Sequence, residues 1–294
     1  MGLLRSLVSL AVAASAAQAA APRIAGFTVT WTDDFNGGRN SPPNSANWIT
    51  DTGKNYPGGP ANWGTGEVQT YTSSVNNLRL NGASALEIVA LKDSSGAWTS
   101  GRIETQRKDF MARAGGVMRI QASLKLPSVS QPVGYWPAFW ALGAAYRGNY
   151  TNWPGVGEFD IMENVNGLNK AWGVLHCDTN PGGACNEANG LGGSRTCPGS
   201  ACQGNFHTYT LEVDRSAKPE AVRWFLDGTL FWQVIDTDMP AAVWNKTVHN
   251  PIFILLDLAI GGSFPNGVYG SSTPLSTTTS GGVFTVDYVA VYNK

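Results

Sequence analysis

Three carboxylates fall within the segment Gly157–Glu163, which reads GEFDIME. In a β-strand, residues two apart share a face, so Glu158 and Asp160 point the same way. Strict alternation would turn Glu163 to the other face, and one extra residue, a β-bulge, would return it. The intervening apolar residues would anchor the opposite face: Phe159, Ile161 and one of Met162 and Val165. The spacing predicts a bulged strand that presents three acids to one side.

Such crowding is costly, because like charges repel and partial burial makes ionisation harder. An exposed acidic strand would not be flanked by Phe, Ile and Met, and calcium sites usually lie on loops with mixed ligands. Paired carboxylates do cleave glycosidic bonds. One attacks the anomeric carbon, and the other protonates the leaving oxygen and then acts as a base; a retaining enzyme holds the two about 5–5.5 Å apart. The first needs a low pKa and the second a raised one, and Asp160 can help to separate them.

The elements around this segment read as strands. Short runs rich in β-branched and aromatic residues recur between Gly, Pro, Asn and Asp, and several alternate with period two. The predicted strands are 27–32, 86–91, 116–125, 135–142, 157–162, 172–176, 207–214, 221–226, 229–234, 252–259 and 283–292. A helical turn is predicted only for 240–245. The pattern predicts an all-β protein, a β-jelly roll sandwich of two antiparallel sheets.

Two details of the strands can be tested. Pro137 lies within the run 135–142, and proline cannot donate to a ladder, so we expect that strand to be bulged there or near an edge. The segments TWTDDF (30–35) and TVDYVAVY (285–292) both read as long strands, and we expect them to pair and to close one end of the sandwich.

Composition limits the class of protein. The chain has 294 residues, of which 43% are apolar and only 14% charged, with 20 basic and 21 acidic residues. No run of like charge is present, so we expect neither nucleic acid nor membrane as a partner. Without repeats or dividing linkers, residues 22–294 read as one domain, which we expect to be a monomer. The 11 Trp suit either a Trp-rich core or a cleft in which indole rings stack on sugars.

Residues 1–21 resemble a secretory signal peptide. Arg5 gives a short basic region, Leu7–Ala14 is apolar, and Ala17–Ala19 fits a small-x-small cleavage site, for which Ala21 would also serve. We therefore expect a secreted, extracellular protein. The asparagines of two glycosylation sequons, Asn149 and Asn245, gain meaning only in that setting.

The four cysteines lie in one Gly-rich stretch, and an even number in a secreted chain predicts two disulfides. Their spacing is poor for zinc. Three pairings are open among Cys177, Cys185, Cys197 and Cys202.

The motif Glu-x-Asp-x-x-Glu preceded by Gly resembles that of glycoside hydrolase family 16, in the bulged form of its laminarinase-like members. The similarity covers nearly the whole chain after residue 21. Its other blocks are 63–72, 100–103, 136–140, 206–209, 225–228, 258–262 and 287–289. The resemblance implies a concanavalin A-like jelly roll with a cleft across its concave sheet. It also implies retaining hydrolysis of β-1,3- or β-1,3-1,4-glucan, with no cofactor for catalysis.

On this resemblance, Glu158 is the nucleophile, Asp160 assists it, and Glu163 is the acid/base. Trp153 would stack on a sugar rather than pack a loop. His176 would lie near the leaving-group side, with a satisfied interior histidine as the alternative. His207 and Tyr209 are expected to be structural.

Further substrate-binding candidates carry alternatives. Trp136 and Trp140 share one face of their strand, which is either part of the core or the floor of the cleft. We expect Trp136 to line the cleft. Arg102 would bind sugar hydroxyls or orient a carboxylate, or else form a surface ion pair. Glu67 and Gln69 share a face and are expected to bind sugar hydroxyls.

A structural calcium ion is also implied away from the cleft. Asp287, opening the last strand, would bind it together with backbone carbonyls near Asp33 or Asp34, although such an Asp could simply bond to a turn. The sequence departs from the family pattern at Asp257, where many relatives carry Asn, and at Thr65-Gly66, which replaces paired Asn. These changes leave the glucan linkage open. A transglycosylase on the same scaffold and a non-catalytic lectin are the competing hypotheses.

Overall fold

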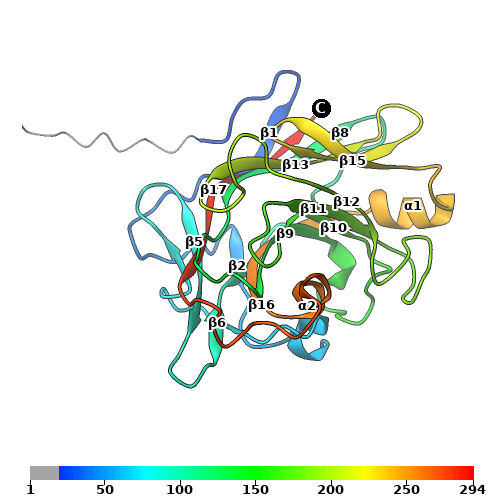
Figure 1. The fold of residues 1–294 in the computed structure, drawn as a ribbon. Coiled ribbons are helices and arrows are strands. Elements are labelled where there is room, and N and C mark those ends of the chain that lie inside the picture. Colours follow the sequence, from blue (N-terminus) through cyan, green and yellow to red (C-terminus); the bar gives the residue numbers. More distant parts are fainter. Residues whose placement is uncertain (1–19) are drawn as a thin grey trace, which may run out of the picture.

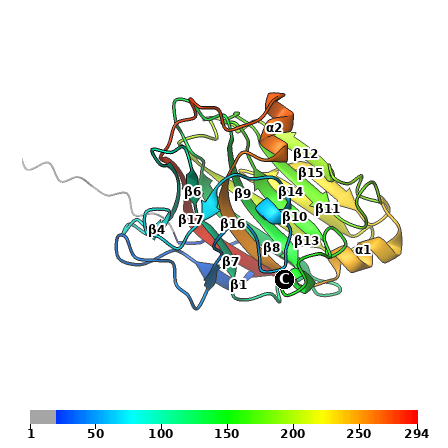
Figure 2. The ribbon, with the colours of Figure 1, turned by 90° about the horizontal axis from the view of Figure 1, so that it is seen from below.

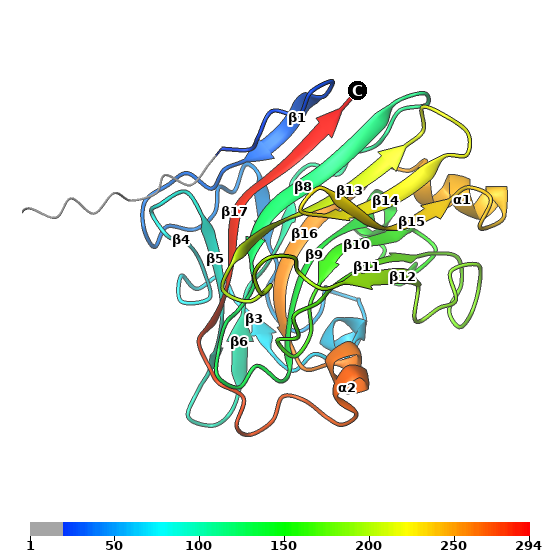
Figure 3. The ribbon, with the colours of Figure 1, turned by 45° about the horizontal axis from the view of Figure 1, so that its top comes forward.

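A computed structural model describes residues 20–294, and the predicted leader at 1–21 lies outside this range except for its last two positions. Within the described residues, the chain forms a ten-stranded and a seven-stranded β-sheet, stacked as two layers (Figures 1 and 3). The predicted all-β sandwich of two sheets is confirmed. The pairing is antiparallel except between β3 and β6, which run parallel.

The ten-stranded sheet forms the outer layer. In spatial order its strands are β15 (Thr229–Ile235), β14 (Ala221–Leu226), β13 (Phe206–Asp214), β8 (Val117–Lys125), β17 (Gly282–Asn293), β5 (Leu86–Lys92), β6 (Trp98–Ser100) and β3 (Thr70–Tyr71). β1 (Thr28–Asp33) pairs with β17, and β4 (Leu78–Leu80) pairs with β5. The predicted pairing of the first and last strands is therefore confirmed.

The seven-stranded sheet carries the acidic segment. Its spatial order is β12 (Leu191–Arg195), β11 (Ala171–His176), β10 (Glu158–Glu163), β9 (Tyr135–Gly143), β16 (Ile252–Ile260), β7 (Arg102–Thr105) and β2 (Trp48–Thr50). The acids of β10 thus lie near the middle of the sheet, where neighbouring strands on both sides fix the backbone.

The core lies between the two sheets. It includes Ile120 and Leu211 of the outer sheet and Phe159 and Leu256 of the seven-stranded sheet, all at most 1% exposed. Each strand supplies alternate side chains to this layer, as period-two patterning requires. The other face of the seven-stranded sheet is therefore free to carry polar and aromatic groups.

The helices are few and short among residues 20–294. The turn predicted at 240–245 is the start of α1 (Ala241–Val248), and α2 (Ser263–Tyr269) was not predicted. α1 precedes β16 and α2 follows it, so they lie at opposite ends of that strand (Figure 2). No helix of the described part is long and apolar enough to cross a bilayer.

The prediction for Pro137 was wrong. Its strand, β9, is central, and its register with β16 runs unbroken from Tyr135 to Gly143. The Pro137 carbonyl accepts the backbone N–H of Asn164, so the polar groups of Pro137 face the position just beyond the last residue of β10. The missing donor therefore costs no bond with β16.

Candidate active site

The acidic strand β10 contains the predicted bulge. Asp160 pairs with Trp140 and Met162 with Phe139, so β10 holds one more residue than β9 across this interval. The pairing with β11 shifts in the same place, between Asp160 and Glu163. The extra residue returns Glu163 to the face of Glu158, and both line one cavity. The anchors predicted for the opposite face are all buried, at 1% exposure or less: Phe159, Ile161, Met162 and Val165.

A tryptophan from the other sheet secures this bulge. The Trp224 indole N–H donates to the Asp160 carbonyl at 2.7 Å. A side chain at Gly173 would begin 2.4 Å from the Trp224 ring, so the absence of a Cβ leaves room for that ring. Sequence reasoning missed both residues, because a contact between sheets leaves no local signal.

The cavity has a volume of about 570 Å³ and runs along the open face of the sheet from β10 across β9 and β16 to β7. Its aromatic lining consists of Tyr56, Trp63, Trp136, Trp140, Tyr146, Tyr150 and Trp153. Trp48 and Trp224, by contrast, pack in the core. Some tryptophans therefore belong to the core and others line the cavity, so each of the two interpretations of the Trp content holds for part of them. Both Trp136 and Trp140 lie on the cavity side.

The two tryptophans of β9 donate to acids in the cavity. The Trp136 indole N–H bonds Glu163 Oε1 at 2.9 Å, and the Trp140 indole N–H bonds Asp257 Oδ1 at 2.7 Å. Each ring thus orients a carboxylate through its N–H group.

The acids of the site differ in their charged neighbours. Burial, reinforced by Asp160, raises the pKa of Glu158 to about 8, against the opposing charges of His176 and Arg102. Burial and Asp160 also raise the pKa of Glu163 well above its usual value, where the main opposing contact is the neutral Trp136 N–H. The expectation of a low pKa for Glu158 in the free protein is not met. His176 favours ionisation of both glutamates, and Arg102 acts in addition on Glu158, so the surrounding charges favour the ionised form more at Glu158 than at Glu163.

His176 lies beside these acids rather than lining the cavity. Its Nε2 lies 3.4 Å from Asp160 Oδ2 and its Nδ1 2.7 Å from Glu187 Oε2. Its ring centroid is 5.6 Å from that of Trp153, which does line the cavity. Burial alone would lower the pKa of His176, but the bonds to Asp160 and Glu187 raise it well above its usual value.

Arg102 is buried and is not part of a surface ion pair. Its Nε lies 3.2 Å from Asp51 Oδ2, and the guanidinium carbon lies 4.4 Å from the ring centre of Trp63 and 4.9 Å from that of Trp140. Tyr56 accepts a bond from Arg102 Nη2 at 3.2 Å. Arg102 thus holds the aromatic wall of the cavity in place. Sequence reasoning missed Asp51 and Tyr56, which come from a distant loop.

Glu67 and Gln69 differ in placement. Glu67 lines the cavity, whereas Gln69 is fully buried and donates to Glu67 Oε2 while accepting the Ile260 N–H. Gln69 therefore cannot reach a sugar and instead supports Glu67, a correction to its expected role. Gln69 was misassigned because two residues on the same face can still be buried to different depths.

Asp257 completes this part of the cavity. The single proton of the Tyr71 hydroxyl faces both Glu67 Oε2, at 2.8 Å, and Asp257 Oδ2, at 3.1 Å. Burial raises the pKa of Asp257 to about 7, although Arg102 opposes the shift. One hydroxyl proton cannot be donated to two carboxylates at once. If Asp257 is protonated, it can donate to the Tyr71 oxygen, and the Tyr71 proton can then go to Glu67.

The disulfides join consecutive cysteines. Cys177 pairs with Cys185, and Cys197 pairs with Cys202. Both sequon asparagines, Asn149 and Asn245, are exposed.

Asp287 lies at a bulge in the middle of β17 and does not open the strand, which corrects the prediction. Its Oδ1 is buried without a hydrogen-bond partner. Burial raises its pKa, and the nearby Asp34 adds to the shift. A buried, unpaired carboxylate oxygen beside a second acid suits an oxygen-coordinated cation, so these residues fit the implied calcium ion.

A jelly roll that presents two glutamates in an aromatic cavity defines a glycoside hydrolase, and the comparisons agree. A family model described as "XgeA-like, catalytic GH16 domain" matches residues 102–205. The crystal structure of endo-1,3-β-glucanase from Streptomyces sioyaensis is 50% identical, covers 94% of this chain and 99% of that one, and superposes with a TM-score of 0.91. The chain belongs to glycoside hydrolase family 16.

Two curated relatives are more distant. The glucan endo-1,3-β-glucosidase A1 of Niallia circulans is 29% identical over 93% of this chain, and the β-glucanase of Rhodothermus marinus is 28% identical over 90%. The chain spans 39% of the length of the first and 85% of the second.

Proposed function

We propose that the protein is an endo-β-1,3-glucanase that hydrolyses laminarin-type glucan with retention of anomeric configuration. The bulge in β10 supports this most directly, because it turns Glu158 and Glu163 into one cavity. The named activity of the Streptomyces sioyaensis relative supports the substrate class.

In the first step the Glu158 carboxylate attacks the anomeric carbon, and the bond to the departing sugar oxygen breaks. Glu163 gives that oxygen its proton, so the products are a glycosyl ester on Glu158 and a shortened glucan. In the second step water attacks the anomeric carbon and gives its proton to Glu163, and Glu158 leaves as a carboxylate. His176 and Arg102 stabilise the charge of Glu158, and Trp136 orients Glu163.

The test is release of reducing sugar from laminarin and lichenan by the wild type and by Glu158→Gln. We expect the wild type to cleave laminarin and the variant to bind it without turnover. Normal cleavage by the variant would show that Glu158 is not the nucleophile. Activity on lichenan would extend the substrate to mixed-linkage glucan, and binding without turnover by the wild type would identify a lectin.

Two product analyses refine the mechanism. The first anomer released, followed by proton NMR, is expected to be β, and a first α anomer would indicate an inverting enzyme. Longer products formed in the presence of an added oligosaccharide acceptor would identify a transglycosylase.

We propose that the protein is secreted, on the basis of the leader pattern and the two disulfides. Expression of the full chain in a secreting host, followed by N-terminal sequencing, should place the cleavage after Ala19 or Ala21. An unprocessed intracellular product would contradict this proposal.

We propose that one structural Ca²⁺ binds at Asp287, away from the cavity. Removal of calcium with a chelator should lower the melting temperature of the wild type, and Asp287→Asn should abolish that sensitivity. The reaction itself uses only side chains of this protein. A melting temperature that does not respond to calcium would contradict this site.

A further inference from the structure

The loop after β11 delivers a carboxylate to the back of His176. Glu187 Oε2 lies 2.7 Å from His176 Nδ1, and its side chain has no exposed surface. On the other side of the ring, Nε2 faces Asp160 at 3.4 Å. The imidazole therefore bridges a residue of the catalytic strand to a residue outside the cavity lining.

The loop is built to hold Glu187 in this place. The Cys177–Cys185 disulfide closes its base, and the backbones of Gly182 and Glu187 exchange two hydrogen bonds. Glu187 Oε1 accepts the Cys177 N–H at 2.8 Å, which fixes the second oxygen of the carboxylate. Gly190 has a φ of +72°, and a Cβ there would lie 2.9 Å from the His176 ring, so only glycine lets the loop approach so closely.

We propose that Glu187 is a positioning residue that holds His176 as a cation against Asp160 and thereby sets the protonation of the two catalytic glutamates. The disulfide loop would thus contribute to catalysis without contacting the substrate. This proposal rests on the hydrolase function proposed above, because it concerns the same carboxylates.

The charges around His176 explain why a fixed cation matters there. Glu158, Asp160 and Glu163 approach it from β10 and Glu187 from the loop, while Arg102 on β7 is the other cation that acts on Glu158. Glu187 Oε2 lies at hydrogen-bond distance from Nδ1, and Asp160 Oδ2 lies 3.4 Å from Nε2, so acids flank both ring nitrogens and favour the protonated ring. If the ring lost its proton, a positive charge that offsets the repulsion between Glu158 and Asp160 would be lost, and the catalytic acids would bind protons more tightly.

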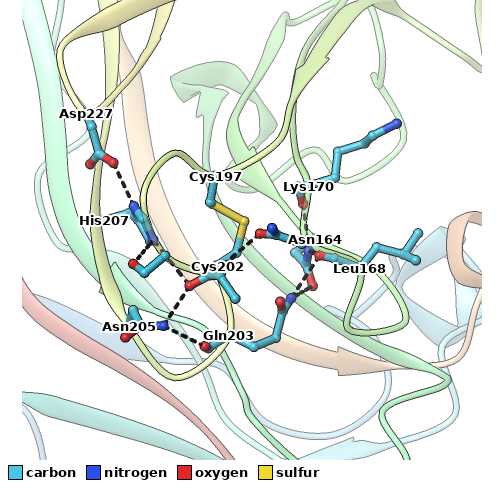
Figure 4. Close-up of a disulfide and its surroundings, with 12 residues drawn as sticks. Asn164, Leu168, Lys170, Cys197, Cys202, Gln203, Asn205, His207 and Asp227 are labelled. Carbon is cyan, nitrogen blue, oxygen red and sulfur yellow. Dashed lines mark hydrogen bonds and ion pairs between the residues drawn. A yellow bond between two sulfur atoms is a disulfide. The ribbon is translucent and has the colours of Figure 1, made fainter.

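A second histidine–carboxylate pair provides a matched control. His207 Nδ1 lies 2.6 Å from Asp227 Oδ2 (Figure 4). Its Nε2 lies 3.3 Å from Ser200 Oγ and 3.3 Å from the Ala201 carbonyl oxygen. This pair also lies beside a disulfide, Cys197–Cys202, but its residues do not line the active-site cavity. It has a carboxylate on one nitrogen only, so it tests the contact without the catalytic acids.

The first experiment is an NMR titration of the imidazole nitrogens. The chain has only three histidines, so His207→Gln and His249→Gln variants suffice to assign the spectrum. We expect wild-type His176 to keep its proton well above pH 6.5, and Glu187→Gln to lower its titration midpoint by on the order of one unit or more. Titration of wild-type His176 near pH 6.5 would overturn the proposal, even if the variant failed to fold.

The second experiment compares pH profiles of kcat/KM, which report the free enzyme. His176→Gln removes the cation and is expected to move the profile to higher pH by on the order of one unit. Glu187→Gln also removes an anion that itself raises the pKa of Glu158, so its profile should move in the same direction, but by less, over the pH range in which His176 has lost its proton. Asp227→Asn should leave the profile in place. A Glu187→Gln profile that coincides with the wild type while His176→Gln shifts would overturn the proposal.

The two experiments separate failure of this inference from failure of the proposed function. The titration of His176 needs no substrate, so it reports on Glu187 even if laminarin is not cleaved. If laminarin is cleaved but Glu187→Gln loses activity equally at every pH, Glu187 serves only the fold and the positioning role is refuted.

Discussion

A cluster of buried acids and a single buried acid, Glu220, have opposite surroundings in this molecule. In the cavity, Glu158, Asp160 and Glu163 face one another, and burial and mutual repulsion raise the pKa values of both glutamates. At the base of α1, Glu220 instead accepts bonds from the Trp244 indole at 2.8 Å and from His249, and Arg215 and Lys218 lie nearby.

The electrostatic consequence differs accordingly. Burial alone would raise the pKa of Glu220, but the contacts with His249 and Trp244 outweigh it and hold the pKa at about 2. Folding therefore favours the ionised form of Glu220 and disfavours that of Glu158 and Glu163. Glu220 is thus paired with cations, whereas the acids of the cavity are kept close together at a cost in stability.

The largest effect is expected from Glu163→Gln, which should lower kcat on laminarin by about 10³-fold through loss of the proton donor. Glutamine can still accept the Trp136 N–H. A raised folded pKa means that Glu163 contributes stability below its unfolded pKa and loses it as pH rises through the folded value. The variant should therefore be at least as stable as the wild type at pH 8, as measured by thermal unfolding. A less stable variant at pH 8 would show that Glu163 does not destabilise the fold as the comparison with Glu220 requires.

Glu220→Gln should show the reverse pattern. It should lower the free energy of unfolding at pH 7 by about 2–3 kcal/mol, because a buried group loses its charge-assisted bonds, and leave kcat/KM unchanged. A lowered folded pKa gives stability that is present above the unfolded value near 4.5 and lost as pH falls through about 2. The difference from the wild type should shrink over that window in urea titrations. A difference independent of pH would show that packing, not charge, is responsible.

Asp257→Asn tests the cost of acids within the cavity. Asparagine can accept the Trp140 N–H and donate to the Tyr71 oxygen, the two bonds that a protonated Asp257 can make. The contribution of Asp257 to the stability of the wild type is fully present below pH 3.8 and is lost as pH rises through about 7. The variant should match the wild type at pH 4 and exceed it by up to about 4 kcal/mol at pH 8 in urea titrations, the equivalent of a rise in the pKa of Asp257 from 3.8 to about 7. Equal stability at both pH values would refute this assignment.

The smallest effect is expected at an exposed ion pair. Arg107 Nε lies 2.8 Å from Asp109 Oδ1, but both side chains are largely exposed, at 42% and 69%. Asp109→Asn should change the free energy of unfolding by less than about 0.5 kcal/mol, because water and salt screen the pair. A larger loss of free energy of unfolding, measured by the same denaturation, would show that the exposure of this ion pair does not predict its contribution to stability.

Local patterning determined most of the strands. The alternation of apolar and polar residues placed β5, β8, β13 and β16 to within two residues at each end. The crowding of three acids on an apolar strand required the bulge in β10 and identified the face of Glu163. The short strands β2, β3, β4, β6, β7 and β12 were not predicted as elements, because so few residues carry no clear period.

The sequence by itself thus determined the class of fold, the acidic strand and the chemistry that its spacing allows, because these depend on side-chain periods within one segment. Only the tertiary structure decided that Pro137 lies in a central strand, that Gln69 is buried behind Glu67, and that the loop of Cys177 and Cys185 brings Glu187 to His176. These depend on which distant segments become neighbours and how deep each side chain lies. No period along the chain records either property.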